Sequence, residues 1–132
     1  MSGAGPGRLR VLVVDDDRDF CDNLEEILNQ HGYQVESAPE ARSALEAARK
    51  QFFHLVLLKT RLLDQNLPHL YRQLEEVSPR TRLILLSGSE EEGFNCGLPG
   101  LACGLFIKSR DIRGLLTMIA ERVVPIYSRS RP

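Results

Sequence analysis

The segment Leu55-Val-Leu-Leu58 is apolar at every position, with no alternation between hydrophobic and polar residues. This pattern is typical of a strand in the middle of a parallel sheet, because helices cover both faces of such a strand. Arg82-Leu-Ile-Leu-Leu86 shows the same continuous apolar run after its first residue. The two segments therefore predict two central strands of a parallel sheet.

Short apolar runs and amphipathic segments alternate on both sides of these strands. Three further strands are expected at residues 9–14, 33–37 and 105–107. Helices are expected between the strands, because apolar residues recur there at spacings of three and four. The first helix is expected to stop at Gly32, and the second to open at Pro39. The third should run from about Pro68 to Val77, and the last should be capped by Ser109 and ended by Pro125. Glycine and proline limit any helix within residues 90–100 to a short one.

This alternation predicts an α/β fold with a doubly wound parallel sheet in a single domain. We expect the domain at residues 8–125 of the 132, after a flexible leader at 1–7 and before a polar tail at 126–132. In such sheets the ligand crevice lies beyond the carboxyl ends of the strands. The polar residues that end or follow the strands are Asp15, Asp16, Asp17, Lys59, Ser87 and Lys108.

Charge and composition exclude several classes of protein. The formal net charge is -1, so the chain lacks the basic surface that nucleic-acid binding needs. The sequence shows neither a signal peptide nor an apolar membrane span. The cysteines Cys21, Cys96 and Cys103 have neither zinc-site spacing nor an even number for disulfide pairing. A reducing cytoplasm is therefore the expected setting.

Three segments together resemble the signatures of receiver domains in two-component response regulators. They are Val13-Val-Asp-Asp-Asp17, Leu85-Leu-Ser-Gly88 and Ala102-Cys-Gly-Leu-Phe-Ile-Lys108. The resemblance implies a five-stranded, flavodoxin-like sheet in the order 2-1-3-4-5. It also implies that Asp15 and Asp16 are the acidic pair for Mg²⁺, that Ser87 is the switch hydroxyl, and that Lys108 pairs with a phosphoryl group.

The sequence also departs from the receiver pattern at the positions that carry the chemistry. Lys59 stands where the resemblance places the phosphoacceptor aspartate, so the usual acyl phosphate cannot form. Leu63 and Leu67 replace a proline and a glycine that are common in the next loop. Leu105 occupies the aromatic switch position, and Ser109 replaces the proline that usually follows the lysine. Phosphorylation and its structural readout are both expected to be lost.

Formal charge predicts the state of the crevice. Asp15, Asp16, Lys59 and Lys108 sum to zero, so the attraction for a divalent cation is expected to be weak or absent. At about 4 Å and an effective dielectric near 20, one pair of unit charges interacts by about 4 kcal/mol. Lys59 is therefore expected within reach of Asp15 or Asp16. The alternative is that Lys59 extends its ammonium group to bulk solvent.

The resulting hypothesis is a pseudo-receiver that binds signalling proteins, such as a histidine kinase or an output protein, without phosphorylation. It is not expected to be an enzyme. A homodimer is also possible, because Leu98, Leu101, Leu105 and Ile112 make the region of the fourth helix, fifth strand and fifth helix apolar.

Two alternatives remain open from the sequence. One is a conventional phosphorelay receiver with a displaced acceptor, for which Asp64 is the only acid in the loop after the third strand. The other is a small ligand-binding or catalytic domain in which Lys59 is a nucleophile or an anion anchor.

Overall fold

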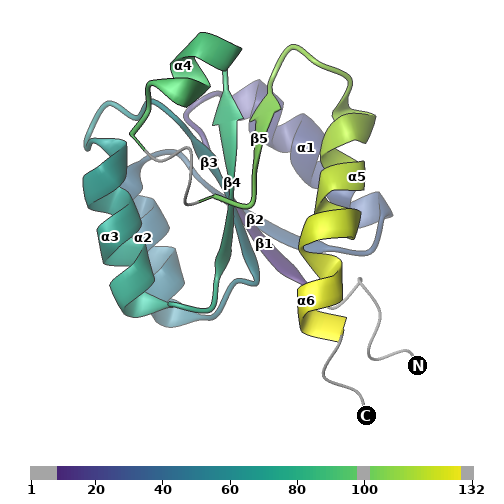
Figure 1. Cartoon of the computed structure of the whole chain (residues 1–132). Coiled ribbons are helices and arrows are strands. Elements are labelled where there is room, and N and C mark those ends of the chain that lie inside the picture. The colour runs from purple at the N-terminus through teal and green to yellow at the C-terminus, as the bar shows by residue number, and fades with distance from the viewer. Residues whose placement is uncertain (1–8, 98–101, 129–132) are drawn as a thin grey trace.

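The computed structural model describes residues 9–97 and 102–128, which contain one sheet of five parallel strands (Figure 1). The strands lie in the order β2-β1-β3-β4-β5, and all four neighbouring pairs are parallel. Their bounds are β1 Arg10–Val14, β2 Gln34–Ala38, β3 Leu55–Lys59, β4 Arg82–Ser87 and β5 Gly104–Ile107. The predicted fold class and strand order are confirmed.

Helices cover both faces of the sheet (Figure 1). One face carries α1 (Arg18–Gln30) and α5 (Ile112–Arg122), and the other carries α2 (Ala41–Lys50) and α3 (Leu67–Val77). The short helix α4 (Glu90–Phe94) follows β4, and α6 (Val124–Ser128) follows α5. Within residues 9–97 and 102–128, no helix is long and apolar enough to cross a membrane.

The central strand β3 is apolar throughout because it contributes to two separate cores. Leu55 and Leu57 pack into the cluster on the α1 and α5 side of the sheet. Val56 and Leu58 pack into the cluster on the α2 and α3 side. All four side chains are almost completely buried. Side chains of a strand alternate between faces, so burial on both faces requires an apolar residue at each position.

Two helix starts differ from the sequence prediction. The helix α2 begins at Ala41 with Glu40 as its N-cap, so Pro39 precedes the helix instead of opening it. The N-cap of α5 is Asp111, whose carboxylate accepts a hydrogen bond from the Arg113 backbone at 2.9 Å. Asp111 lies directly before the first helical residue, whereas Ser109 lies too early to reach those amides.

The end of the chain also differs from the prediction, because Pro125 lies inside a helix. The helix α5 ends at Arg122, and Pro125 is the second residue of α6. Proline is tolerated in a first helical turn, where its missing N–H has no partner to lose. The predicted domain boundary at residue 125 therefore falls within α6. The predicted leader at 1–7 and the last four residues of the predicted tail lie outside the described residues.

Aromatic residues hold α6 against the amino-terminal edge of the sheet. The Tyr127 hydroxyl donates hydrogen bonds to the backbone carbonyls of His54, at 3.2 Å, and of Arg80. The His54 ring packs edge-to-face against both Phe52 and Tyr127. Its Nδ1 accepts a hydrogen bond from the Arg10 backbone N–H at 3.0 Å. Burial, and secondarily the Arg10 charge, lower the pKa of His54.

We expect the domain to lose stability as the pH falls below about 6.5, the usual pKa of histidine. Because the folded-state pKa of His54 is lowered, the unfolded chain takes up the proton more readily, so acid favours unfolding. Protonation also removes the Nδ1 acceptor, a loss of about 1 kcal/mol. Urea unfolding at pH 7.5 and pH 5.5 measures this difference in unfolding free energy.

The matched control for this prediction is His54→Asn, because an asparagine oxygen can accept the same hydrogen bond and does not titrate in this range. The variant should show a clearly smaller pH dependence than the parent chain. Equal pH dependence in both proteins would assign the effect to other groups.

Candidate functional site

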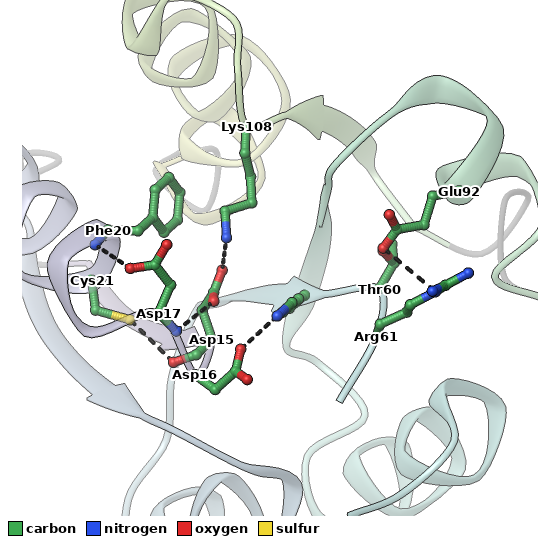
Figure 2. Close-up of polar contacts among 10 residues, drawn as sticks. Asp15, Asp16, Asp17, Phe20, Cys21, Thr60, Arg61, Glu92 and Lys108 are labelled. Atoms are coloured by element: carbon green, nitrogen blue, oxygen red, sulfur yellow. Dashed lines mark hydrogen bonds and ion pairs between the residues drawn. The ribbon is translucent and has the colours of Figure 1, made fainter. Parts of the chain in front are cut away.

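The carboxyl edge of the sheet brings together charged side chains from the ends of three strands, as the sequence predicts. Asp15 and Asp16 follow β1, Lys59 ends β3, and Lys108 follows β5. Figure 2 shows Lys108 pointing toward Asp15, beside Asp17 and Phe20 at the start of α1. This arrangement follows from the parallel sheet, in which all carboxyl ends lie at one edge.

Asp15 is the buried acid of the crevice, with 2% of its surface exposed. Its Oδ1 accepts a hydrogen bond from the Asp17 backbone N–H at 2.9 Å, and its Oδ2 lies 2.8 Å from the Lys108 Nζ. Among the described residues, Oδ2 accepts no hydrogen bond of regular geometry, so the Lys108 charge is its compensation. The Lys108 ammonium also lies 4.4 Å from the centre of the Phe20 ring.

Asp16 and Lys59 form the second ion pair, with the Lys59 Nζ 2.5 Å from the Asp16 Oδ1. This pair is more accessible, since 42% of the Asp16 side chain and 26% of the Lys59 side chain are exposed. The hydrogen bond from Lys59 lowers the pKa of Asp16, and the same bond raises the pKa of Lys59. The predicted reach from Lys59 to the acidic pair is confirmed, and the solvent-directed alternative is wrong.

The predicted switch positions are engaged within the fold itself. Ser87 is fully buried, and its hydroxyl donates to the Ser89 carbonyl at 2.5 Å and accepts from the Ser89 N–H at 3.2 Å. Leu105 is half-buried on the α2 and α3 side of the sheet and packs closely against Gly93 of α4. Both residues therefore fix the position of α4 relative to β4 and β5.

Glu92 is a crevice residue that the sequence analysis missed. From α4 it accepts a hydrogen bond from the Thr60 hydroxyl at 2.8 Å and lies 3.9 Å from the Arg61 Nε (Figure 2). Ser89-Glu-Glu-Glu92 has the spacing of a capping box, in which the glutamate returns to the N-cap backbone. Only half of that box forms, through the Glu92 N–H and the Ser89 hydroxyl. The motif is thus a signal in the sequence for the cap, which the sequence analysis did not use, and it does not give the direction of the Glu92 carboxylate.

Asp64 lies at the start of α2. Its two carboxylate oxygens accept hydrogen bonds from the backbone N–H groups of Ala41, at 3.0 Å, and Arg42, at 3.1 Å. These bonds, led by the one from Ala41, lower the pKa of Asp64. The side chain therefore caps a helix that lies more than twenty residues away in sequence.

The two carboxylates that the resemblance assigns to a metal ion are both paired with lysine side chains. Across residues 9–97 and 102–128, no three His, Cys, Asp or Glu side chains are placed to hold one metal ion. Asp15 and Asp16 each have a lysine at contact distance. The crevice thus contains two ion pairs, each of which joins one aspartate and one lysine.

Comparison with known proteins gives a consistent family signal. Residues 11–119 match the family model described as response regulator receiver domain. The chain is 32% identical over 119 residues to the transcriptional regulatory protein ZraR of Escherichia coli, covering 89% of this chain and 27% of that protein. It is 35% identical over 78 residues to a response regulator receiver protein of Anaeromyxobacter, covering 59% of this chain and 33% of that protein.

Solved structures show the same fold. A CheY-like receiver domain protein from Methanospirillum hungatei is 29% identical with a TM-score of 0.80, and the match covers 93% of this chain and 98% of that one. The non-phosphorylated HemR receiver domain from Leptospira biflexa is 30% identical with a TM-score of 0.72, covering 95% and 98%. The chain spans only about a quarter to a third of the length of the Escherichia coli and Anaeromyxobacter proteins.

Proposed function

Because this chain belongs to the response regulator receiver family of two-component signalling, we propose that it is a pseudo-receiver, which binds signalling proteins without accepting a phosphoryl group. Receiver domains interact with kinases and output domains. We propose that this domain keeps such interactions but is not phosphorylated. The observation that carries it is the Lys59 ammonium, 2.5 Å from Asp16 at the end of the central strand.

The ion pairs support a site that does not need Mg²⁺. Mg²⁺ prefers oxygen ligands in near-octahedral geometry, and proteins usually hold it through one or two carboxylates that are free to bind it, together with several waters. Here Asp16 is paired with Lys59, and Asp15 with Lys108. Lys59 adds a positive charge at the strand end where the resemblance expects a third carboxylate. The residues present do not fit the ion, and we propose that the domain works without it.

The switch residues support the same proposal. The Ser87 hydroxyl is used by the turn that leads into α4, and Leu105 has no aromatic ring to rotate. A receiver that responds to phosphorylation needs an element with two arrangements that the phosphoryl group can shift. The contacts of Ser87 and Leu105 favour one fixed arrangement, as expected for constitutive binding.

The alternative functions have less support. Asp64 is an unsuitable displaced acceptor, because both of its oxygens cap α2. Lys59 is an unsuitable nucleophile, because its raised pKa keeps the amine protonated. In the predicted dimer face, Leu98 and Leu101 lie outside the described residues, and Leu105 and Ile112 are half-buried. The partner proteins, a cytoplasmic location and a homodimer remain proposals.

The proposed function predicts that the parent chain takes no phosphoryl group from acetyl phosphate and shows no Mg²⁺-dependent change in its amide spectrum. Intact-protein mass spectrometry after incubation with acetyl phosphate and Mg²⁺ measures the first, and a Mg²⁺ titration by NMR measures the second. Labelling that disappears in Asp64→Asn would instead establish a displaced acceptor. Labelling on Asp15 or Asp16 would also overturn the proposal.

A further inference from the structure

A groove of about 640 Å³ lies between the loop after β3 and the helix α4. One wall is formed by residues 60–63 and 65–68, and the other by Ser89, Glu91, Glu92, Asn95 and Cys96. The hydrogen bond from Thr60 to Glu92 joins the two walls (Figure 2). The groove lies beside the crevice and shares Glu92 with it, but the two ion pairs of the crevice, Asp15 with Lys108 and Asp16 with Lys59, do not line it.

A fully exposed leucine stands on one wall of this groove. Leu63 is 98% exposed, whereas the other large exposed apolar residue of the described chain, Phe52, is 39% exposed. The loop that carries Leu63 is held in place by two sets of contacts. Asp64 caps α2 with both carboxylate oxygens, and Leu62 pairs with Gln65 in an isolated antiparallel bridge. A rigid loop that presents an apolar side chain loses little conformational entropy when a partner covers it.

The opposite wall carries negative charge. Helix α4 begins with Glu90, Glu91 and Glu92. Glu90 pairs with Arg110, and Glu92 is held by Thr60 and Arg61. Glu91 lines the groove and is exposed, and no salt bridge joins it to another residue of the described chain. The groove therefore offers an apolar anchor on one side and, on the other, a carboxylate that forms no salt bridge within the described residues.

From this juxtaposition we propose that the groove docks a basic amphipathic helical segment of a partner protein. The partner's apolar face covers Leu63 and the half-buried Leu62 and Pro68, and its lysine or arginine side chains face Glu91. Helices of this kind commonly dock into grooves through apolar anchors one turn apart. This inference rests on the proposed function of protein binding, and it assigns the surface and the chemistry of the partner.

The experiment is an NMR titration of the full chain with a short amphipathic peptide built of leucine and lysine. Amide shifts are expected in residues 60–68 and 89–96. The same peptide with glutamate in place of lysine should give none of these shifts. Leu63→Ser and Glu91→Lys should each weaken binding by about tenfold or more, the effect typical of an interface anchor. Both positions are exposed, so neither variant should disturb folding.

Glu26→Lys is the matched control, because Glu26 is an exposed acid on α1, away from the groove. It should leave peptide affinity unchanged. Shifts confined to α1, or an affinity unaffected by Leu63→Ser, would overturn the inference. Sedimentation that shows self-association lost in Leu63→Ser would also overturn it, by making a second copy the occupant. None of these results depends on Mg²⁺ or acetyl phosphate, so the inference and the proposed function fail separately.

Discussion

Lys59→Asp is expected to bind Mg²⁺ far more tightly than the parent chain does. The substitution removes the cation that lies 2.5 Å from Asp16 and places a third carboxylate at the end of β3. The formal charge of the four crevice positions changes from zero to -2. Mg²⁺ affinity should rise by about a hundredfold or more, equivalent to about 2.7 kcal/mol. Calorimetric titration of Mg²⁺ into both proteins measures the change.

The matched control for this substitution is Lys59→Gln, which removes the positive charge without adding a ligand. It should bind Mg²⁺ more weakly than Lys59→Asp, because the ion takes charged oxygen ligands in preference to an amide alone. Equal affinity in the parent and in Lys59→Asp would contradict the account of the crevice.

Lys59→Asp is also expected to label weakly from acetyl phosphate without changing the distal face of the domain. Leu105 cannot act as an aromatic rotor, and Ser109 does not restrict the backbone as proline would. Amide shifts on labelling should therefore stay near the crevice. Large shifts along β5 and α5 would show that another residue transmits the change.

Lys108→Met is expected to destabilise the domain by about 3 kcal/mol or more at neutral pH, because it leaves a buried carboxylate without its counter-charge. Asp15 is 2% exposed, and its Oδ2 has the Lys108 ammonium at 2.8 Å. Urea unfolding of both proteins measures the loss.

Two further variants separate this effect from simple loss of a lysine. Lys50→Met removes an exposed lysine at the end of α2 and should change stability by no more than about 0.5 kcal/mol. Asp15→Asn combined with Lys108→Met removes both charges and should recover most of the lost stability. A loss below about 1 kcal/mol in Lys108→Met alone would mean that water, not the lysine, compensates Asp15.

The sequence by itself determined the sheet and the edge where the site lies. The apolar runs at β3 and β4 required burial on both faces, which only a central position in a parallel sheet provides. The residues just after the strands were then brought to one edge by the topology alone. This reasoning needs the hydrophobic pattern of each strand and the alternation of strands with helices along the chain, both of which can be read from the sequence.

Only the tertiary structure decided which groups pair at that edge. Lys108 takes Asp15 and Lys59 takes Asp16, although the sequence allowed Lys59 to reach either acid. Likewise, Glu92 bonds to Thr60, and Asp64 caps a helix from a distant loop. The physical reason is geometric. The hydrophobic pattern of the sequence assigns a residue to a face or an edge of the sheet, but which two side chains pair depends on how deeply each is buried and on which way it points, within a few ångströms. Those are set only when separate segments pack together.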